Sequence, residues 1–139
     1  MIVLDTNVLS EMLRPRPDPI VVDWLARQAP AQVFTTAISE AEIHYGVSRL
    51  EAGKRKDALV EAVAGIFGED FAGRILAFDS TAAAAYGRIV SDRERSGRPI
   101  SQFDAQIAAI ALSFGADVAT RNIRDFEDCG SRLINPWQP

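Results

Sequence analysis

The sequence contains a single cysteine, Cys129, and a single histidine, His44, among its 139 residues. One cysteine cannot form a disulfide framework, and neither residue has the neighbouring cysteine or histidine that a zinc site requires. Any metal that the chain binds must therefore be held by oxygen atoms. The lack of paired cysteines also leads us to expect a reducing, cytoplasmic environment.

Long hydrophobic runs are also absent. No segment approaches the ~20 apolar residues that a membrane-spanning helix needs, and the sequence does not open on a basic stretch followed by an apolar one, as a secretory signal would. We therefore expect no membrane association. Hydrophobic residues make up 47% of the chain, which is enough for an ordinary core, and we predict a single domain over residues 1–139.

Positive charge is scarce. The 15 Lys and Arg residues stand against 19 Asp and Glu residues, which gives a net charge of −4 at pH 7. This balance argues against a protein that coats nucleic acid with a broad basic face, although it does not exclude a nuclease. Three small basic groups could contact phosphate or could be solvated helix ends: Lys54–Lys56; Arg93, Arg95 and Arg98; and Arg121 with Arg124.

Short apolar segments alternate along the chain with stretches of helical periodicity. The strand-like segments are 2–4, 33–36, 75–78, 118–120 and 132–134, and the helical ones are 38–50, 55–67, 81–95, 103–114 and a stretch around Trp24. Strands that alternate with helices favour right-handed crossovers and a parallel sheet. The predicted fold class is α/β, with three layers in which helices flank a central parallel sheet.

Three acidic residues follow a predicted strand or border a predicted helix. Asp5 directly follows segment 2–4, Glu42 borders the apolar face of segment 38–50, and Asp104 lies at the start of segment 103–114. Because ligands of an open parallel sheet bind beyond the carboxyl ends of its strands, these positions are candidates for a site. Each also has an ordinary structural explanation, as a helix cap for Asp5 and Asp104 and as a half-exposed helix charge for Glu42.

A fourth oxygen donor is available in the segment after strand 118–120, where Asn122 and Asp125 occur. Polar turn residues are the alternative explanation for both. Three carboxylates that meet in a partly desolvated cleft repel one another strongly. Mg²⁺ or Mn²⁺ would relieve this repulsion, since both prefer oxygen ligands, and would lower the pKa of a water molecule for attack on a phosphodiester.

Four motifs resemble the PIN-domain family in order and spacing, and in particular the VapC/FitB toxins of bacterial type II toxin–antitoxin pairs. The resemblance spans nearly the whole chain. The motifs are Val3–Val8, Thr36–Gly46, Phe103–Ala109 and Ala119–Asn122, and the closing Asn135–Trp137 resembles the FitB-like branch.

The resemblance implies a PIN-like fold and a metal-dependent endoribonuclease. The catalytic residues would be Asp5, Glu42, Asp104 and Asn122, with the three acids as ligands of Mg²⁺ or Mn²⁺. Many family members have Asp where this chain has Asn122. Either Asn122 or Asp125 could therefore complete the site, which leaves both one-metal and two-metal arrangements open.

Other residues in the motifs have implied supporting roles. Thr6 and Asn7 are expected to orient Asp5 or a metal-bound water, and Arg121 and Arg124 are candidates for RNA phosphate contacts. Glu40 and Glu42 lie two residues apart, which is about 200° around a helix, so they cannot both face the site. We prefer Glu42 because its spacing to Gly46 matches the family pattern.

The resemblance also implies partners. It suggests tRNA or another structured RNA as substrate, a homodimer, and a cognate antitoxin with a DNA-binding domain, which could join the toxin in a larger assembly. The large residues Trp24, Tyr45 and Trp137 are of the type enriched at interfaces, and core packing is the alternative for each.

Two other enzyme classes do not fit. A phosphotransferase of the haloacid dehalogenase type needs a second acid two residues after the first, and Asn7 occupies that position. A receiver domain needs a lysine at the end of a late strand, whereas the only lysines are Lys54 and Lys56. A catalytically impaired PIN-like module, which acts by binding protein or nucleic acid, stays as the alternative because Asn122 replaces an acid.

Overall fold

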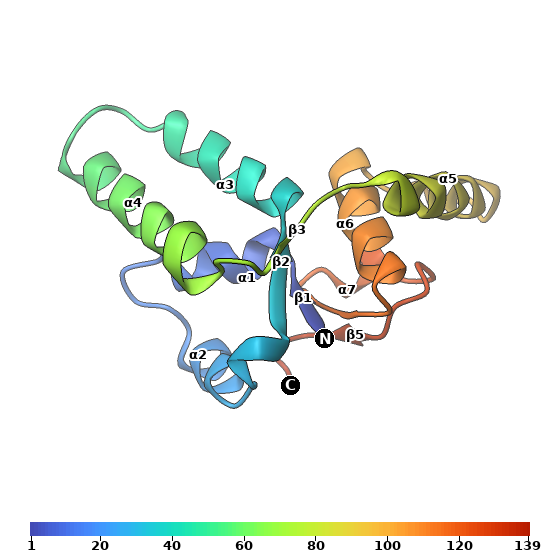
Figure 1. Cartoon of the computed structure of the whole chain (residues 1–139), viewed down its shortest axis with the longest axis horizontal. Helices are drawn as coiled ribbons and strands as arrows, with labels where there is room; N and C mark the ends of the chain where they lie inside the picture. Colours follow the sequence, from blue (N-terminus) through green and yellow to red (C-terminus); the bar gives the residue numbers. More distant parts are fainter.

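The computed structural model describes residues 1–139 (Figure 1), and five strands form its centre. The sheet order is β3-β2-β1-β4-β5, and every neighbouring pair is parallel, as the alternation of strands and helices predicts. The strands are β1 (Ile2–Leu4), β2 (Val33–Thr36), β3 (Ile75–Leu76), β4 (Asp117–Ala119) and β5 (Leu133–Ile134).

Helices cover both faces of this sheet, which confirms the predicted three-layer α/β class. The helices are α1 (Thr6–Met12), α2 (Pro19–Ala26), α3 (Ala37–Ser48), α4 (Lys54–Gly65), α5 (Ser80–Arg95), α6 (Gln102–Ser113) and α7 (Ile123–Phe126), with short turns η1 (Pro30–Gln32) and η2 (Ile66–Asp70). Figure 1 shows the α3–α4 hairpin on one side of the strands and the α5–α6 pair on the other. No helix has both the length and the hydrophobicity that crossing a bilayer requires.

The core is divided by the sheet into two hydrophobic clusters. One cluster lies under α5 and α6, where alanines such as Ala82, Ala85 and Ala108 let the two helices approach closely. The other joins β1 and β2 to α1, α2 and α4 and includes Trp24, for which the core alternative is therefore correct. Val3 on one face and Leu4 on the other are both fully buried, as expected for a central parallel strand.

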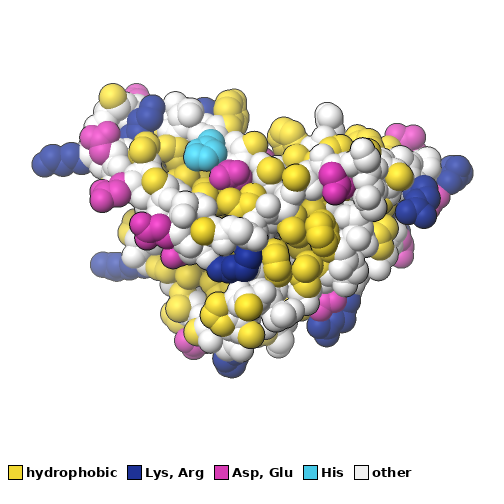
Figure 2. Space-filling view, in the orientation of Figure 1, with side chains coloured by type: hydrophobic (Ala, Val, Ile, Leu, Met, Phe, Trp, Pro, Cys, Tyr) yellow, Lys and Arg dark blue, Asp and Glu magenta, His cyan; other side chains and the backbone are white.

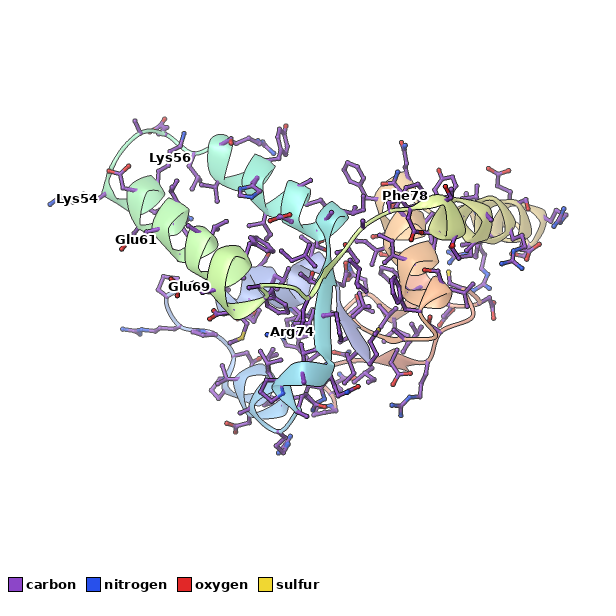
Figure 3. The ribbon with its side chains drawn as sticks, in the orientation of Figure 1. Lys54, Lys56, Glu61, Glu69, Arg74 and Phe78 are labelled. Atoms are coloured by element: carbon purple, nitrogen blue, oxygen red, sulfur yellow. The ribbon has the colours of Figure 1, made fainter.

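Several element boundaries differ from the sequence prediction. The strand predicted over 75–78 ends at Leu76, because its neighbour β2 ends at Thr36, the residue that pairs with Leu76. The chain then passes through Phe78 to α5 along the edge of the sheet (Figures 1 and 3). Residues 123–126 form one helical turn, α7, in a segment that is not among the predicted helices.

Hydrophobic side chains remain visible at this sheet edge. On the face shown in Figure 2 they gather between the α3–α4 hairpin and α5, and charged side chains lie mostly around the rim. The partly buried Phe34, Leu76 and Phe78 extend the α5–α6 cluster toward this region.

The topology brings three chain segments to one end of the sheet. Asp5 follows β1, Thr36 ends β2 and Thr120 follows β4, and these are three adjacent parallel strands. Gly115, with φ +63°, follows the end of α6 in the left-handed conformation and turns the chain back into β4. The carboxyl ends of the central strands therefore form the floor of the candidate site.

Candidate active site

Asp5 is the buried centre of the site. The side chain is 4% exposed, and the backbone N–H of Thr6 donates to its Oδ1 over 2.7 Å, which caps α1. The hydroxyl of Thr120, at the end of the neighbouring strand, donates to Oδ2 over 2.8 Å. The predicted cap role of Asp5 is confirmed, and it leaves a further lone pair on each oxygen for a ligand.

The surroundings of Asp5 oppose its ionisation. Burial raises the pKa of Asp5 from 3.8 to about 6, against the hydrogen bonds from Thr120 and Thr6, which lower it. The negative charges of Asp104 and Glu42 raise this pKa further. A cation bound here would stabilise the ionised form.

Glu42 reaches the site from α3 and is held by a hydroxyl of α1. The Thr6 hydroxyl lies 2.9 Å from Glu42 Oε1 and 2.9 Å from Ser39 Oγ. A carboxylate can only accept, so Thr6 donates its proton to Glu42 and accepts one from Ser39. Burial raises the pKa of Glu42, the bond from Thr6 lowers it, and the charge of Asp104 raises it.

Glu40 faces a different direction. Its carboxylate lies 3.9 Å from the imidazole Nε2 of His44, one helical turn further along α3. The two acids of α3 thus point to different neighbours, as their offset around the helix requires. Glu42, and not Glu40, contacts the residue that follows Asp5.

Asp104 approaches from the opposite side, in the first turn of α6. Its backbone N–H donates to the hydroxyl of Ser101 over 3.3 Å, so the cap role considered for Asp104 belongs to Ser101. Burial raises the pKa of Asp104, the Ser101 hydroxyl lowers it, the charge of Asp125 raises it, and that of Arg93 lowers it. Asp104 in turn raises the pKa of both Asp5 and Glu42, so the three acids act electrostatically as one group.

The two candidates for the fourth position lie on the turn that follows β4. Asn122 donates its backbone N–H to the Thr120 hydroxyl over 3.0 Å, and its side chain is exposed and does not cap α7. Asp125 is exposed as well and lies near enough to Asp104 to raise its pKa. Asn122 is thus linked to the Asp5 side of the site and Asp125 to the Asp104 side.

Thr120 and Ser39 are site residues that the sequence reasoning missed. Both are completely buried. The Thr120 hydroxyl donates to Asp5 and accepts from the backbone N–H of Asn122 and, over 3.3 Å, from the side-chain amide of Asn7, which uses its one proton and both lone pairs. Asn7 therefore acts on Asp5 through Thr120 rather than directly. A polar residue at the end of an apolar strand was the available signal.

The interpretation of the second basic group as solvated helix ends or phosphate contacts is wrong for Arg93. It is only 5% exposed, because Ala82, Ala85, Ile89 and Arg93 share the buried stripe of α5. Its guanidinium donates to the carbonyls of Arg98, over 2.7 Å, and of Asp125 and Glu127, each over 3.0 Å. Arg93 thus ties the loop before Asp104 to the segment that contains Asp125.

The other residues of the three basic groups differ in whether they form ion pairs and in where they lie. Arg95 pairs with Asp92, and Arg98 pairs with Glu127 and Asp128. Figure 3 shows Lys54 and Lys56 at the tip of the α3–α4 hairpin, far from the strands. Arg121 and Arg124 are exposed next to Asn122 and make no ion pair.

The oxygen donors of the site suit a hydrated metal ion better than a directly chelated one. No three acidic, histidine or cysteine side chains lie close enough together to chelate an ion directly. Mg²⁺ and Mn²⁺ suit oxygen donors, and Mg²⁺ usually keeps several waters while it binds through one or two carboxylates. Asp5, Glu42 and Asp104 supply carboxylate oxygens whose negative charges act on one another, so the residues fit a hydrated divalent cation.

A groove opens beside Glu42, between α1, α3 and α4. Its volume is about 610 Å³, and Thr6 and Glu42 lie among its lining residues. The rest of the wall is largely apolar with two arginines: Ser10, Leu13, Arg14, Pro15, Ile43, Gly46, Val47, Leu50, Arg55, Ala58, Leu59 and Ala62. The groove therefore connects an apolar surface to the acidic site.

Comparison with known proteins gives consistent matches over the full length. The profile of the family described as "PIN domain" matches residues 2–130. The chain is 39% identical over 139 residues to "VapC ribonuclease Y4jK" of Sinorhizobium fredii, covering 100% of this chain and 99% of that protein. It is 42% identical over 137 residues to "Toxin FitB" of Neisseria gonorrhoeae, covering 99% of each.

Solved structures give the same result. "Structure of FitAB bound to IR36 DNA fragment" contains a chain that superposes with a TM-score of 0.94 at 42% sequence identity. The match covers 100% of this chain and 97% of that one.

Proposed function

This chain belongs to the PIN-domain family, resembling its VapC/FitB toxins, and we propose that its acidic site cleaves RNA with a divalent cation. The chain is a ribonuclease, the toxin of a type II toxin–antitoxin pair, which inhibits growth unless its antitoxin binds. The observation that carries the proposed site is that Asp5, at the end of β1, is linked through Thr6 to Glu42 of α3, while the charge of Asp104 in α6 raises the pKa of both acids. The family match over residues 2–130 supports one PIN domain that spans the chain.

The proposed ligands of Mg²⁺ or Mn²⁺ are Asp5, Glu42 and Asp104, with Asn122 or Asp125 at the fourth position. When bound, the cation supplies Lewis acidity to the phosphate and lowers the pKa of the attacking water. The chain itself directs two of the acids before any ligand arrives, since Thr6 donates to Glu42 and Thr120 donates to Asp5. Preset carboxylates avoid the cost of reorganisation when the cation binds.

Acid–base catalysis by a pair of histidines is not open to this chain. His44 is the only histidine, its side chain is 60% exposed, and it faces Glu40 on α3. The two lysines lie at the tip of the α3–α4 hairpin (Figure 3). The carboxylates are thus the groups at the site that can support hydrolysis, and this supports metal dependence.

The substrate that we propose is a folded RNA such as tRNA. The chain has a net charge of −4, and the cations near the acids that form no ion pair are Arg121, Arg124 and, in the groove beside Glu42, Arg55. A nuclease with so few phosphate contacts gains little from the general attraction of a long single strand. Recognition of the shape of a folded RNA would provide the binding specificity that so few charged contacts cannot provide.

The antitoxin is the second proposed partner. The FitAB structure contains a relative of this chain in a complex bound to DNA, which supports a partner with a DNA-binding domain. We propose that the two proteins meet in the cytoplasm, where the RNA substrate is available. The groove beside Glu42 suits an apolar segment of such a partner that ends over the acids. The hydrophobic side chains at the β3 edge support a homodimer, which could build a larger assembly (Figure 2).

The test is cleavage of a folded RNA by the purified chain with and without Mg²⁺ or Mn²⁺. We expect EDTA and Asp5→Asn each to abolish cleavage, and Glu40→Gln, on the same helix as Glu42 but outside the site, to keep it. Cleavage by Asp5→Asn at the wild-type rate would refute the assignment. The alternative, a non-catalytic binding module suggested by Asn122 in place of an acid, predicts no metal-dependent cleavage at all, and the named ribonuclease relatives do not support it.

A further inference from the structure

We propose that Arg121 and Trp137 form one phosphate-binding unit at the edge of the acidic site, in which the indole holds the guanidinium in position for RNA. Trp137 is thereby assigned a positioning role in substrate binding. The inference rests on the proposed ribonuclease function and adds a residue from the far end of the chain to its substrate site.

The backbone of Arg121 is fixed next to Asp5. Arg121 directly follows Thr120, whose hydroxyl donates to Asp5 over 2.8 Å. The backbone N–H of Arg121 donates to the side-chain oxygen of Asn7 over 3.3 Å. Because both neighbours belong to the network that holds Asp5, the exposed side chain of Arg121 must start at the edge of the acidic site.

The indole of Trp137 provides a fixed support for this side chain. The Arg121 guanidinium carbon lies 4.9 Å from the centroid of the Trp137 ring, within the range of a cation–π interaction. Trp137 is partly buried against the cluster that includes Leu4 and Val8, and its backbone N–H donates to Asn135 Oδ1 over 2.9 Å. The ring is therefore held by the core on one side while it contacts the guanidinium.

Stacking leaves the hydrogen-bonding edge of Arg121 free. A guanidinium has five N–H donors in its plane, and contact between its face and an indole uses none of them. Arg121 has no carboxylate partner, whereas Arg98 and Arg132 do. A planar donor edge with no acid of its own suits a phosphate, which it can bind through two parallel hydrogen bonds.

The position of Arg121 beside the Asp5 network gives this support a function. An arginine on a flexible stem that begins one residue after the Thr120–Asp5 hydrogen bond can turn back onto that carboxylate, which would compete with the cation. The attraction of the indole competes with this movement. Trp137 thus keeps the guanidinium at the edge of the site, where the scissile region of an RNA would pass.

The experiment measures RNA binding without cleavage, using a folded RNA and the Asp104→Asn chain in Mg²⁺. We expect Arg121→Ala to weaken binding about tenfold and to reduce the slope of log K against log salt by about 0.7–0.9, as for one lost phosphate contact. Trp137→Leu should reproduce most of this loss, Trp137→Phe only part, and Arg121→Lys should keep the slope but lose affinity. Arg27→Ala, which removes an exposed arginine after α2 at the other end of the sheet, is the matched control and should change neither.

A spectroscopic signal reports on the pair directly. Trp24 is the only other tryptophan, and in Trp24→Phe the emission comes from Trp137 alone. We expect added RNA to change this emission, and Arg121→Ala to abolish the change. In the active chain, Trp137→Leu should raise KM and leave kcat close to the wild-type value.

The outcomes separate this inference from the proposed function. A wild-type chain that does not cleave RNA refutes the proposed function. A wild-type chain that cleaves RNA, while Arg121→Ala keeps the wild-type affinity, salt slope and KM, overturns the inference alone. If Trp137→Leu does not fold, Arg121→Ala and Trp137→Phe still decide the question, because the first is exposed and the second keeps an aromatic ring.

Discussion

The two sides of the acidic site are built differently. Asp5 and Glu42 are held by side-chain hydroxyls that come from the ends of buried strands and the start of α1. On the other side, the Asp104 segment is fixed through its backbone, by the Ser101 cap and by the carbonyls that Arg93 binds. The first side fixes the direction of the carboxylates themselves, whereas the second fixes the chain and leaves the Asp104 side chain fewer restraints.

This difference suggests that the two sides of the site have different roles in binding the cation and the RNA. The side with Asp5 and Glu42 is positioned before any ligand is present, and it contains Asp5, whose pKa burial raises to about 6. The side with Asp104 and Asp125 can adjust to a hydrated cation and to the RNA. Four measurements test whether the two sides differ in this way.

The catalytic effect of removing Asp104 should be as large as that of removing Asp5, although Asp104 is less restrained. We expect Asp104→Asn to lower kcat/KM by about 10³-fold or more, because a ligand whose role is specific to the reaction cannot be replaced by a neutral amide. The same change should relieve growth arrest on expression, with an unchanged circular dichroism spectrum. Persistent arrest by a folded Asp104→Asn chain would point to toxicity through binding.

The free energy of unfolding, measured in EDTA, should show how much the burial of Asp5 destabilises the fold. The pKa of Asp5 is raised from 3.8 to about 6, so the folded state keeps a proton that the unfolded state has lost between these values. The free energy of unfolding should therefore fall as pH rises through this window, by about 3 kcal/mol in all, and should not fall below it. Asp5→Asn should remove this dependence and be more stable at pH 7.

Urea unfolding from pH 3 to pH 8 measures this effect, with Glu40→Gln as the matched control that should follow the wild type. Adding Mg²⁺ at pH 7 should stabilise the wild type and not Asp5→Asn. A wild-type stability that rises with pH through the window would show that burial does not govern Asp5.

Removing one hydroxyl from each side compares the two networks directly. Thr120→Val keeps the shape but leaves Asn122 N–H and Asn7 without their acceptor, and should cost about 1–3 kcal/mol and lower metal affinity about 10–100-fold. Ser101→Ala removes a helix cap, and should cost about 1 kcal/mol with a smaller change in metal affinity. Chemical unfolding and calorimetric titration with Mn²⁺ give both values. Equal losses of metal affinity would mean that the two sides are prepared alike.

The smallest effect should come from the fourth position. Asn122→Asp should tighten Mn²⁺ binding by a few-fold, since it adds a charge at a place linked to Asp5 through Thr120. If the titration is unchanged, Asp125 is the fourth donor, and Asp125→Asn should then weaken binding where Asn122→Ala does not.

Much of the fold and the acids themselves could be predicted from the sequence. Short apolar runs separated by helical stretches are enough to indicate a parallel sheet, and Asp5 and Asp104 stand at the boundaries of such elements. The edge strand was predicted too long, because its extent depends on a neighbour, β2, that local sequence does not describe.

The supporting residues were harder to predict for a physical reason. Thr120 and Thr36 look like ordinary β-branched strand residues, and the bond from Thr120 to Asp5 joins positions 115 apart, which periodicity cannot detect. The residue type of Arg93 suggests a solvated helix end or a phosphate contact, although its spacing to Ile89 and Ala85 puts it on the buried stripe. Here the pattern was the better guide than the residue type.

The bond between Thr120 and Asp5 also has a consequence for how the toxin is made. Since Thr120 lies 115 residues after Asp5, a nascent chain on the ribosome carries the acid long before its partner emerges. Arg93 is likewise synthesised before Asp125 and Glu127, whose carbonyls it binds in the folded chain. The hydrogen bonds that hold Asp5 and the Asp104 side of the site can therefore form only after both segments of each pair have been synthesised.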